Sequence, residues 1–175
     1  MMNQIRASVF ETNSSSVHSI CISKSFSKYC YTATLYAKTG SFNWEHRIYI
    51  DPEDKLSYLW TAVYCYANNK TRESHDIVLH SQIVQKWEKL INDELSKYEI
   101  NVYFVYSAPY SFTEYNIDHD EQLKQMLDDF EQKPYLISDL ILSSASFVET
   151  SNDNEGTCSF DSNNTNFVYE FEKTN

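Results

Sequence analysis

Glycine is almost absent from this chain, which holds only 2 glycines and 3 prolines in 175 residues. Flexible linkers are rich in glycine, so no segment resembles a boundary between domains. A phosphate-cradling loop needs several closely spaced glycines, which excludes the dinucleotide-binding fingerprint and the P-loop. Since 42% of the residues are apolar and 15% are aromatic, the chain can bury a core. We therefore expect one folded domain over residues 1–175.

Two kinds of hydrophobic periodicity alternate along the chain. Alternating or β-branched runs predict strands at residues 5–10, 17–22, 29–36, 47–50, 99–106, 146–149 and 166–171. Helical spacing of apolar residues predicts helices at residues 52–68, 81–98 and 118–133, whereas residues 135–142 fit a helix or a strand. This order predicts an α+β fold, a mainly antiparallel sheet with about three helices packed on it.

The clearest helix start follows Asp51, which can cap the free amides before Pro52. One face of this helix is apolar, with Leu56, Leu59, Trp60, Val63 and Ala67, and Asn68-Asn69 is predicted to end it. In the strand at residues 17–22, alternation places His18, Ile20 and Ile22 on one face.

The net charge of -11 is unevenly distributed. Residues 1–92 hold 10 Lys/Arg and 8 Asp/Glu, whereas residues 93–175 hold 4 Lys/Arg and 17 Asp/Glu, giving +2 and -13. Such a negative field repels phosphate backbones, so we expect no direct binding of nucleic acid. It favours either a basic protein partner or simple solubility.

No run of residues approaches the roughly 18 apolar residues of a membrane span, and the N-terminus lacks a signal-peptide apolar region. The four cysteines show no CxxC pair, which favours reduced thiols. We therefore expect a cytoplasmic protein with no membrane partner and no cofactor or metal.

The segment from Arg6 to Ile20 concentrates polar side chains between two apolar runs. Arg6 could hold a phosphate or carboxylate, and Glu11 or His18 could move a proton. A serine–histidine–acid arrangement is also conceivable, although no GxSxG elbow exists. The alternative is a tight turn, because Ser, Thr and Asn side chains bond neighbouring backbone groups, with His18 as a core residue.

Three shorter clusters are weaker candidates. Asp118-His119-Asp120 could hold a metal or act as an acid–base pair, but carboxylates also favour the start of a helix. The segment at residues 152–156 has some calcium-loop character but lacks the required spacing, and its composition favours a turn. Trp44-Glu-His46 adds an aromatic, an acid and an imidazole before a predicted strand.

The motif Phe10-Glu-Thr-Asn-Ser-Ser-Ser-Val-His-Ser-Ile20, preceded by Arg6, resembles a group of uncharacterised proteins of phages and mobile elements. Weaker similarities lie at residues 42–45, at 51–61, at 117–119, and at 146–148 with 152–154, where this chain has Asn43 and Ser151 in place of glycine. The resemblance implies a phage-derived cytoplasmic protein in a bacterial host and no particular activity. It also implies that the polar motifs belong to one site.

These observations support three hypotheses. The first is an acidic interaction protein that inhibits a host defence nuclease, of the CRISPR or restriction type, by occupying its basic surface. Its partner-binding residues are expected to be Asp118, Asp120, Glu121, Asp128, Asp129 and Glu131.

The second hypothesis is a small enzyme or a nucleotide- or anion-binding module. Its ligand-binding residues are expected to be Arg6, Glu11, Asn13, Ser14, Ser15, His18, His119, Asp153 and Asn154. The third is a structural or regulatory phage protein without a pocket, with a two-fold interface of exposed Tyr and Trp side chains.

Overall fold

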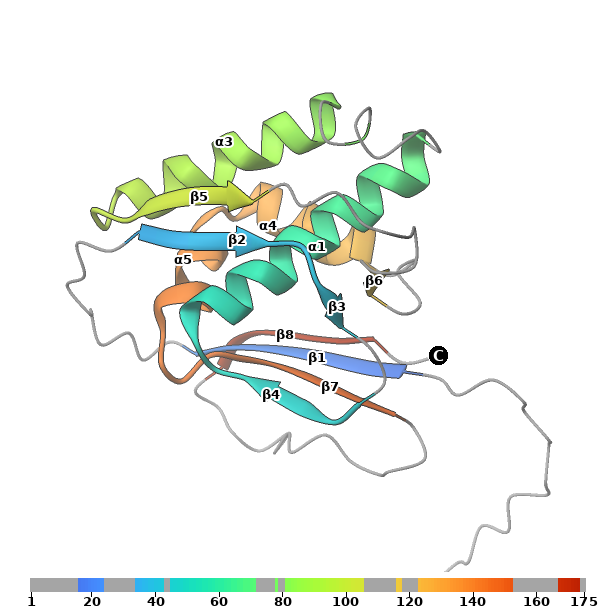
Figure 1. The fold of residues 1–175 in the computed structure, drawn as a ribbon. Helices are drawn as coiled ribbons and strands as arrows, with labels where there is room; N and C mark the ends of the chain where they lie inside the picture. Colours follow the sequence, from blue (N-terminus) through green and yellow to red (C-terminus); the bar gives the residue numbers. More distant parts are fainter. Residues whose placement is uncertain are drawn as a thin grey trace, which may run out of the picture.

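A computed structural model describes residues 16–23, 34–42, 45–71, 78, 81–105, 116–117, 123–152 and 167–173. Among these residues, four helices lie beside one four-stranded sheet and two parallel strand pairs. Figure 1 shows the central helix α1 (Pro52–Thr71) between the four-stranded sheet and the pair formed by β2 (Thr34–Lys38) and β5 (Asn101–Val105). The α+β class with a mainly antiparallel sheet is thus confirmed.

The four-stranded sheet has the order β4-β7-β1-β8 and is antiparallel throughout. Its strands are β4 (Arg47–Tyr49), β7 (Phe147–Asn152), β1 (Ser16–Ser23) and β8 (Phe167–Lys173). Strand β1 is central because it pairs with β7 on one side and with β8 on the other. The strand predicted at residues 5–10 lies outside the described residues.

The face of β1 toward the helices is the one that the alternation predicts. Ile20 and Ile22 are buried in the main core, and the His18 ring contacts Tyr58 of α1. The core continues into α1 through its predicted stripe, because Leu56, Leu59, Trp60, Val63 and Ala67 are all buried. Apolar burial of this kind is the main contribution to the stability of the fold.

Helix α1 begins at Pro52 as predicted but continues to Thr71, so the predicted end at Asn68-Asn69 is wrong. An asparagine in a helix interior costs only about 0.7 kcal/mol relative to alanine. The buried side chain of Ala67 anchors the last turns in the core, which is enough to carry the helix past two such residues.

A polar stripe of α1 satisfies the free edge of β2. Glu53 Oε1 accepts from Tyr36 N, Ser57 Oγ accepts from Lys38 N, and Thr61 Oγ1 accepts from Gly40 N, at 3.2, 3.2 and 3.0 Å. Two residues along a strand span about 6.6 Å, and four residues along a helix span about 6 Å. Acceptors four residues apart on α1 therefore match the spacing of amides two residues apart in the segment from Tyr36 to Gly40. The helix therefore protects an edge that would otherwise be open to strand pairing.

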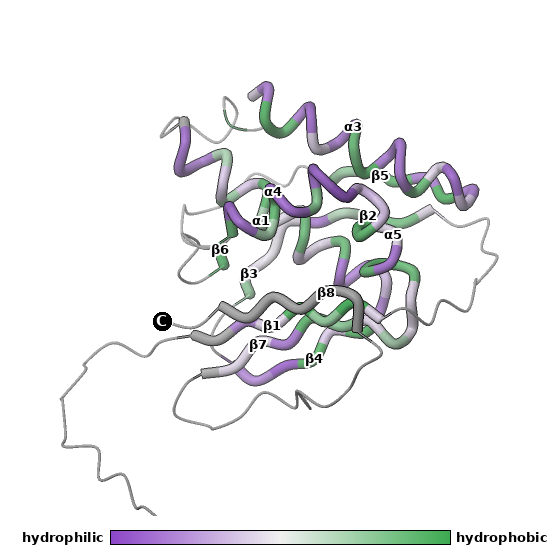
Figure 2. The backbone as a smooth tube through the Cα atoms, turned by 180° about the vertical axis from the view of Figure 1, so that it is seen from behind, coloured by the Kyte–Doolittle hydropathy of each residue, from purple (hydrophilic) through white to green (hydrophobic). Residues whose placement is uncertain are grey.

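The other helices follow from their amphipathic patterns. In α3 (Gln82–Ser96), Ser81 caps the first turn through Val84 N, and Trp87, Ile91 and Leu95 face the core. Figure 2 shows polar and apolar residues alternating along this helix. Helix α4 (Leu123–Gln132) buries its apolar stripe, and α5 (Tyr135–Leu142) is the ambiguous apolar run. Six of the eight residues of α5 are buried, which explains why periodicity could not identify it.

Two features differ from the predictions. Strand β2 pairs in parallel with β5, and β3 (Ser41–Phe42) pairs in parallel with β6 (Asn116–Ile117). Parallel pairing joins segments far apart in the chain, and no local pattern indicates it. Strand β7 extends to Asn152 because it pairs with β1 as far as Ser16, so this residue is not part of the predicted turn.

Candidate functional site

A buried lysine joins α1 to the segment between α5 and β7. Lys55 Nζ donates to the carbonyl oxygens of Ser143 and Ser146, at 2.7 and 3.1 Å. Ser146 Oγ in turn accepts from Ser23 N and donates to the carbonyl of Asp139. Burial lowers the pKa of Lys55 to about 8, against a smaller opposing effect of Asp51. These contacts join α1, β1 and α5, so we assign them a structural role.

His18 of the N-terminal motif is fully buried. Its Nδ1 lies 3.1 Å from Tyr58 Oη, within hydrogen-bonding distance. Burial raises the pKa of Tyr58, which keeps the phenol neutral. The described end of the motif therefore forms a core contact between β1 and α1, as the core-residue alternative predicts.

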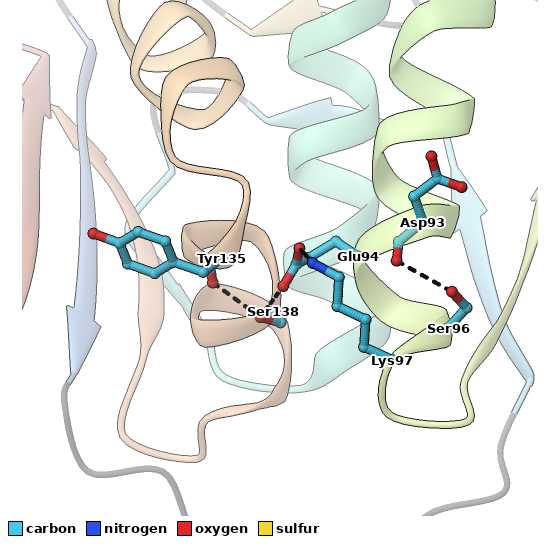
Figure 3. A network of polar contacts seen from close by, with 6 residues as sticks. All are labelled: Asp93, Glu94, Ser96, Lys97, Tyr135 and Ser138. Atoms are coloured by element: carbon cyan, nitrogen blue, oxygen red, sulfur yellow. Dashed lines mark hydrogen bonds and ion pairs between the residues drawn. The ribbon is translucent and has the colours of Figure 1, made fainter.

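A buried glutamate bridges α3 and α5. Glu94 accepts from Ser138 Oγ at 2.9 Å and forms an ion pair with the exposed Lys97, as Figure 3 shows. Burial and then the charge of Glu94 raise the pKa of Asp139 nearby. Since Lys97 and Ser138 already bind the two oxygens of Glu94, the network holds two helices together and leaves neither of these oxygens vacant.

A second buried glutamate lies on the sheet face away from the helices. Glu149 neighbours Val148, which faces the core, so alternation directs its side chain to the opposite face. Its Oε1 lies 3.0 Å from Nε2 of the half-exposed His46. Next to it, Thr150 Oγ1 donates to the carbonyl of Glu45 at 2.7 Å. Two residues of β7 thus fix the segment that enters β4.

A polar cleft opens between β3 and that fixed segment. It has a volume of about 250 Å³, and the described residues that line it are Ser41, Glu45, Arg47 and Tyr49. Arg47 Nη2 donates to Glu45 Oε2 at 2.8 Å, and both side chains are 63% exposed. The Tyr49 ring packs edge-on against Phe42, with centroids 5.2 Å apart, so the aromatic side of the cleft is held in place.

The pair β2–β5 displays two tyrosines to solvent. Tyr36 and Tyr103 are directly opposite each other in the register, with ring centroids 5.9 Å apart and exposed fractions of 43% and 62%. Their neighbours in sequence, Leu35 and Phe104, pack into the core. An adjacent pair of exposed aromatic rings is the kind of anchor that protein interfaces favour.

Three carboxylates lie at the start of α1, and one of them contacts β2. Glu53 contacts the backbone of Tyr36, and Asp51 and Asp54 flank it in sequence. Burial, followed by the charges of Asp51 and Glu53, raises the pKa of Asp54, whereas Lys38 opposes the rise. Within the described part of the chain, none of the three forms an ion pair. We call Tyr36, Tyr103, Asp51, Glu53 and Asp54 the acid–aromatic face.

The predicted partner-binding residues are described only in part. Asp128, Asp129 and Glu131 lie on α4, where Asp128 pairs with Lys124 and Glu131 pairs with Lys86 of α3. Two of these three carboxylates are therefore balanced by lysines of the same chain. Asp118, Asp120 and Glu121 lie outside the described residues, so the prediction for this set stays a prediction.

The predicted ligand-binding residues lie mostly outside the described residues, and only His18 is placed. The residues outside the described ranges are Arg6, Glu11, Asn13, Ser14, Ser15, His119, Asp153 and Asn154. Sequence reasoning missed Glu149 and Arg47. The alternation of β7 could have placed Glu149 on the sheet face away from Val148. Nothing in the sequence, however, indicates that Glu149 contacts His46.

Comparison with protein-family models, with curated proteins and with solved structures found no significant match. Within the described ranges, no group of three or more His, Cys, Asp or Glu side chains could hold a metal ion. No helix of the described segments is both long enough and apolar enough to cross a bilayer.

Proposed function

We propose that this protein is an acidic interaction protein that docks onto a basic surface of another protein. The acid–aromatic face is the observation that carries the proposal. Tyr36 and Tyr103 would supply the central contact area, because tyrosine is enriched among residues that contribute most to binding. The three carboxylates at the start of α1 would attract a basic partner and reject acidic ones.

The partner that we propose is a nuclease of a bacterial defence system, of the CRISPR or restriction type. Such enzymes hold nucleic acid in basic grooves, and an acidic protein competes there with phosphates. The net charge of -11 and the resemblance of the N-terminal motif to phage proteins support this choice. The protein would then act in the cytoplasm of the bacterial host.

The test is a pull-down from host lysate, followed by a nuclease assay with the captured protein. Tagged wild-type protein is expected to retain a basic nuclease and to inhibit its cleavage of nucleic acid. The variant Tyr36→Ser/Tyr103→Ser and the variant Glu53→Gln/Asp54→Asn are each expected to weaken inhibition about tenfold, a loss of about 1.4 kcal/mol. The substitution Glu53→Gln keeps a side-chain oxygen that can accept from Tyr36 N, so the edge of β2 stays satisfied.

The matched control is Asp128→Asn/Glu131→Gln, which removes two charges from α4 instead. It is expected to inhibit like the wild type, because its carboxylates are already paired with lysines. If the α4 variant loses inhibition and the variants of the acid–aromatic face keep it, the docking surface lies on α4 instead. Failure of the wild type to bind or inhibit any basic nuclease would contradict the proposal itself.

A further inference from the structure

The cleft between β3 and β4 combines opposite charges with two hydroxyl groups. Arg47 and Glu45 supply the charges, and Ser41 and Tyr49 supply the hydroxyls. The volume of about 250 Å³ lies just below the roughly 300–1,000 Å³ of pockets for drug-sized ligands. A ligand smaller than a drug molecule would therefore fit in it.

The ion pair inside the cleft is easily opened. Both side chains are mostly exposed, and exposed ion pairs contribute only about 0–1 kcal/mol. A ligand can therefore separate Arg47 from Glu45 at little cost. A simple anion would bind the guanidinium of Arg47 but would leave Glu45 beside a second negative charge. A ligand with both an anionic group and an amine would satisfy both residues.

The backbone of the cleft is already fixed. Thr150 holds the carbonyl of Glu45, and Glu149 holds His46 on the opposite face of the sheet. The next residues, Arg47 and Tyr49, stand opposite Thr150 and Val148 in the register. Ligand binding would therefore require only the rotation of two exposed side chains, and such preorganisation favours affinity.

From this geometry we infer that the cleft binds a small zwitterion, with Arg47 holding its anionic group and Glu45 holding its amine. Ser41 and Tyr49 also line the cleft and would contact the same ligand. This binding site is independent of the proposed docking function, since the acid–aromatic face contributes none of the four described residues that line the cleft.

The test is an NMR titration of the full chain with small probes. Glycine, β-alanine and phosphoethanolamine represent the zwitterion, and acetate, phosphate and ethylammonium represent its separate halves. At least one zwitterion is expected to shift the amide signals of Ser41, Arg47 and Tyr49 saturably at millimolar concentration. Acetate, phosphate and ethylammonium are expected to bind at least about tenfold more weakly, since each satisfies only one of the two charges.

Two variants and one matched control complete the test. Arg47→Gln and Glu45→Gln are each expected to weaken the zwitterion about tenfold, the effect of losing about 1.4 kcal/mol. The control Lys86→Gln/Glu131→Gln removes another exposed ion pair, between α3 and α4, and is expected to bind like the wild type. Because both cleft side chains are exposed, the variants should keep the amide spectrum of the folded chain elsewhere.

Three results would overturn the inference. The first is the absence of saturable shifts at the cleft with every zwitterion at millimolar concentration. The second is phosphate or acetate binding as tightly as the zwitterions, with affinity unchanged or improved in Glu45→Gln, which would make the cleft a simple anion site. The third is equal weakening by the control variant.

Discussion

At the scale of single residues, burial determines which ionisable groups support the fold. Lys55, Glu94 and Glu149 are almost completely buried, and each contacts a group far away in the sequence. Composition and spacing indicate where such residues occur but not which of them are buried, because their partners come from other elements. His18 shows the opposite case, since its place on an apolar strand face predicted its burial.

Lys55 is expected to make stability depend on pH in a defined window. Its folded pKa of about 8 lies below the value of about 10.4 for an unfolded chain. Between these values the unfolded chain binds more protons, so the contribution of Lys55 to stability rises with pH. Below pH 8 both states are charged, and the cost of burying the charge is constant.

We predict that from pH 7 to pH 9.5 wild-type protein gains about 2 kcal/mol in unfolding free energy relative to Lys55→Met. Urea denaturation at both pH values measures this difference. The control Lys89→Met changes an exposed lysine and keeps Lys55, so wild-type protein should show no such gain relative to it. If the unfolding free energy of the wild type changes with pH by the same amount as that of Lys55→Met, Lys55 does not titrate in this window.

At the scale of elements, α1 combines two faces of which the sequence predicts one. Its apolar stripe is evident from helical spacing, and the structure confirms every residue of it. The polar stripe of Glu53, Ser57 and Thr61 has an ordinary surface composition, although the same four-residue spacing is present. Its role requires β2 to lie alongside, and a long-range contact of this kind cannot be inferred from a single sequence.

We predict that Ser57→Ala and Thr61→Val each cost about 0.5–1.5 kcal/mol, since each removes a hydrogen bond to the edge of β2. Hydrogen exchange at the amides of Lys38 and Gly40, respectively, is expected to accelerate. Ser96→Ala is the control, because among the described residues the exposed Ser96 hydroxyl bonds only a carbonyl of its own helix. Unchanged exchange at both amides would mean that α1 does not protect this edge.

At the scale of the whole molecule, the sequence predicts the fold class but not the topology. Alternating strand and helix patterns are local, and they predicted an α+β domain with an antiparallel sheet. The strand order β4-β7-β1-β8 and the parallel pairs depend on contacts between distant segments. The candidate sites likewise combine residues that local patterns indicate with long-range contacts that only the structure shows. The sequence predicts Asp51 as a helix cap, whereas only the pairing of Tyr36 with Tyr103 shows a surface beside it.

The most direct test of the docking proposal is the salt dependence of the affinity for the captured nuclease. From about 0.1 M to about 1 M salt the screening length falls from about 10 Å to about 3 Å. Wild-type affinity is predicted to fall at least about tenfold over this range. Glu53→Gln/Asp54→Asn should bind more weakly at low salt and approach the wild type at high salt. A wild-type affinity independent of salt, or a variant that follows the wild type throughout, would contradict electrostatic docking through the acid–aromatic face.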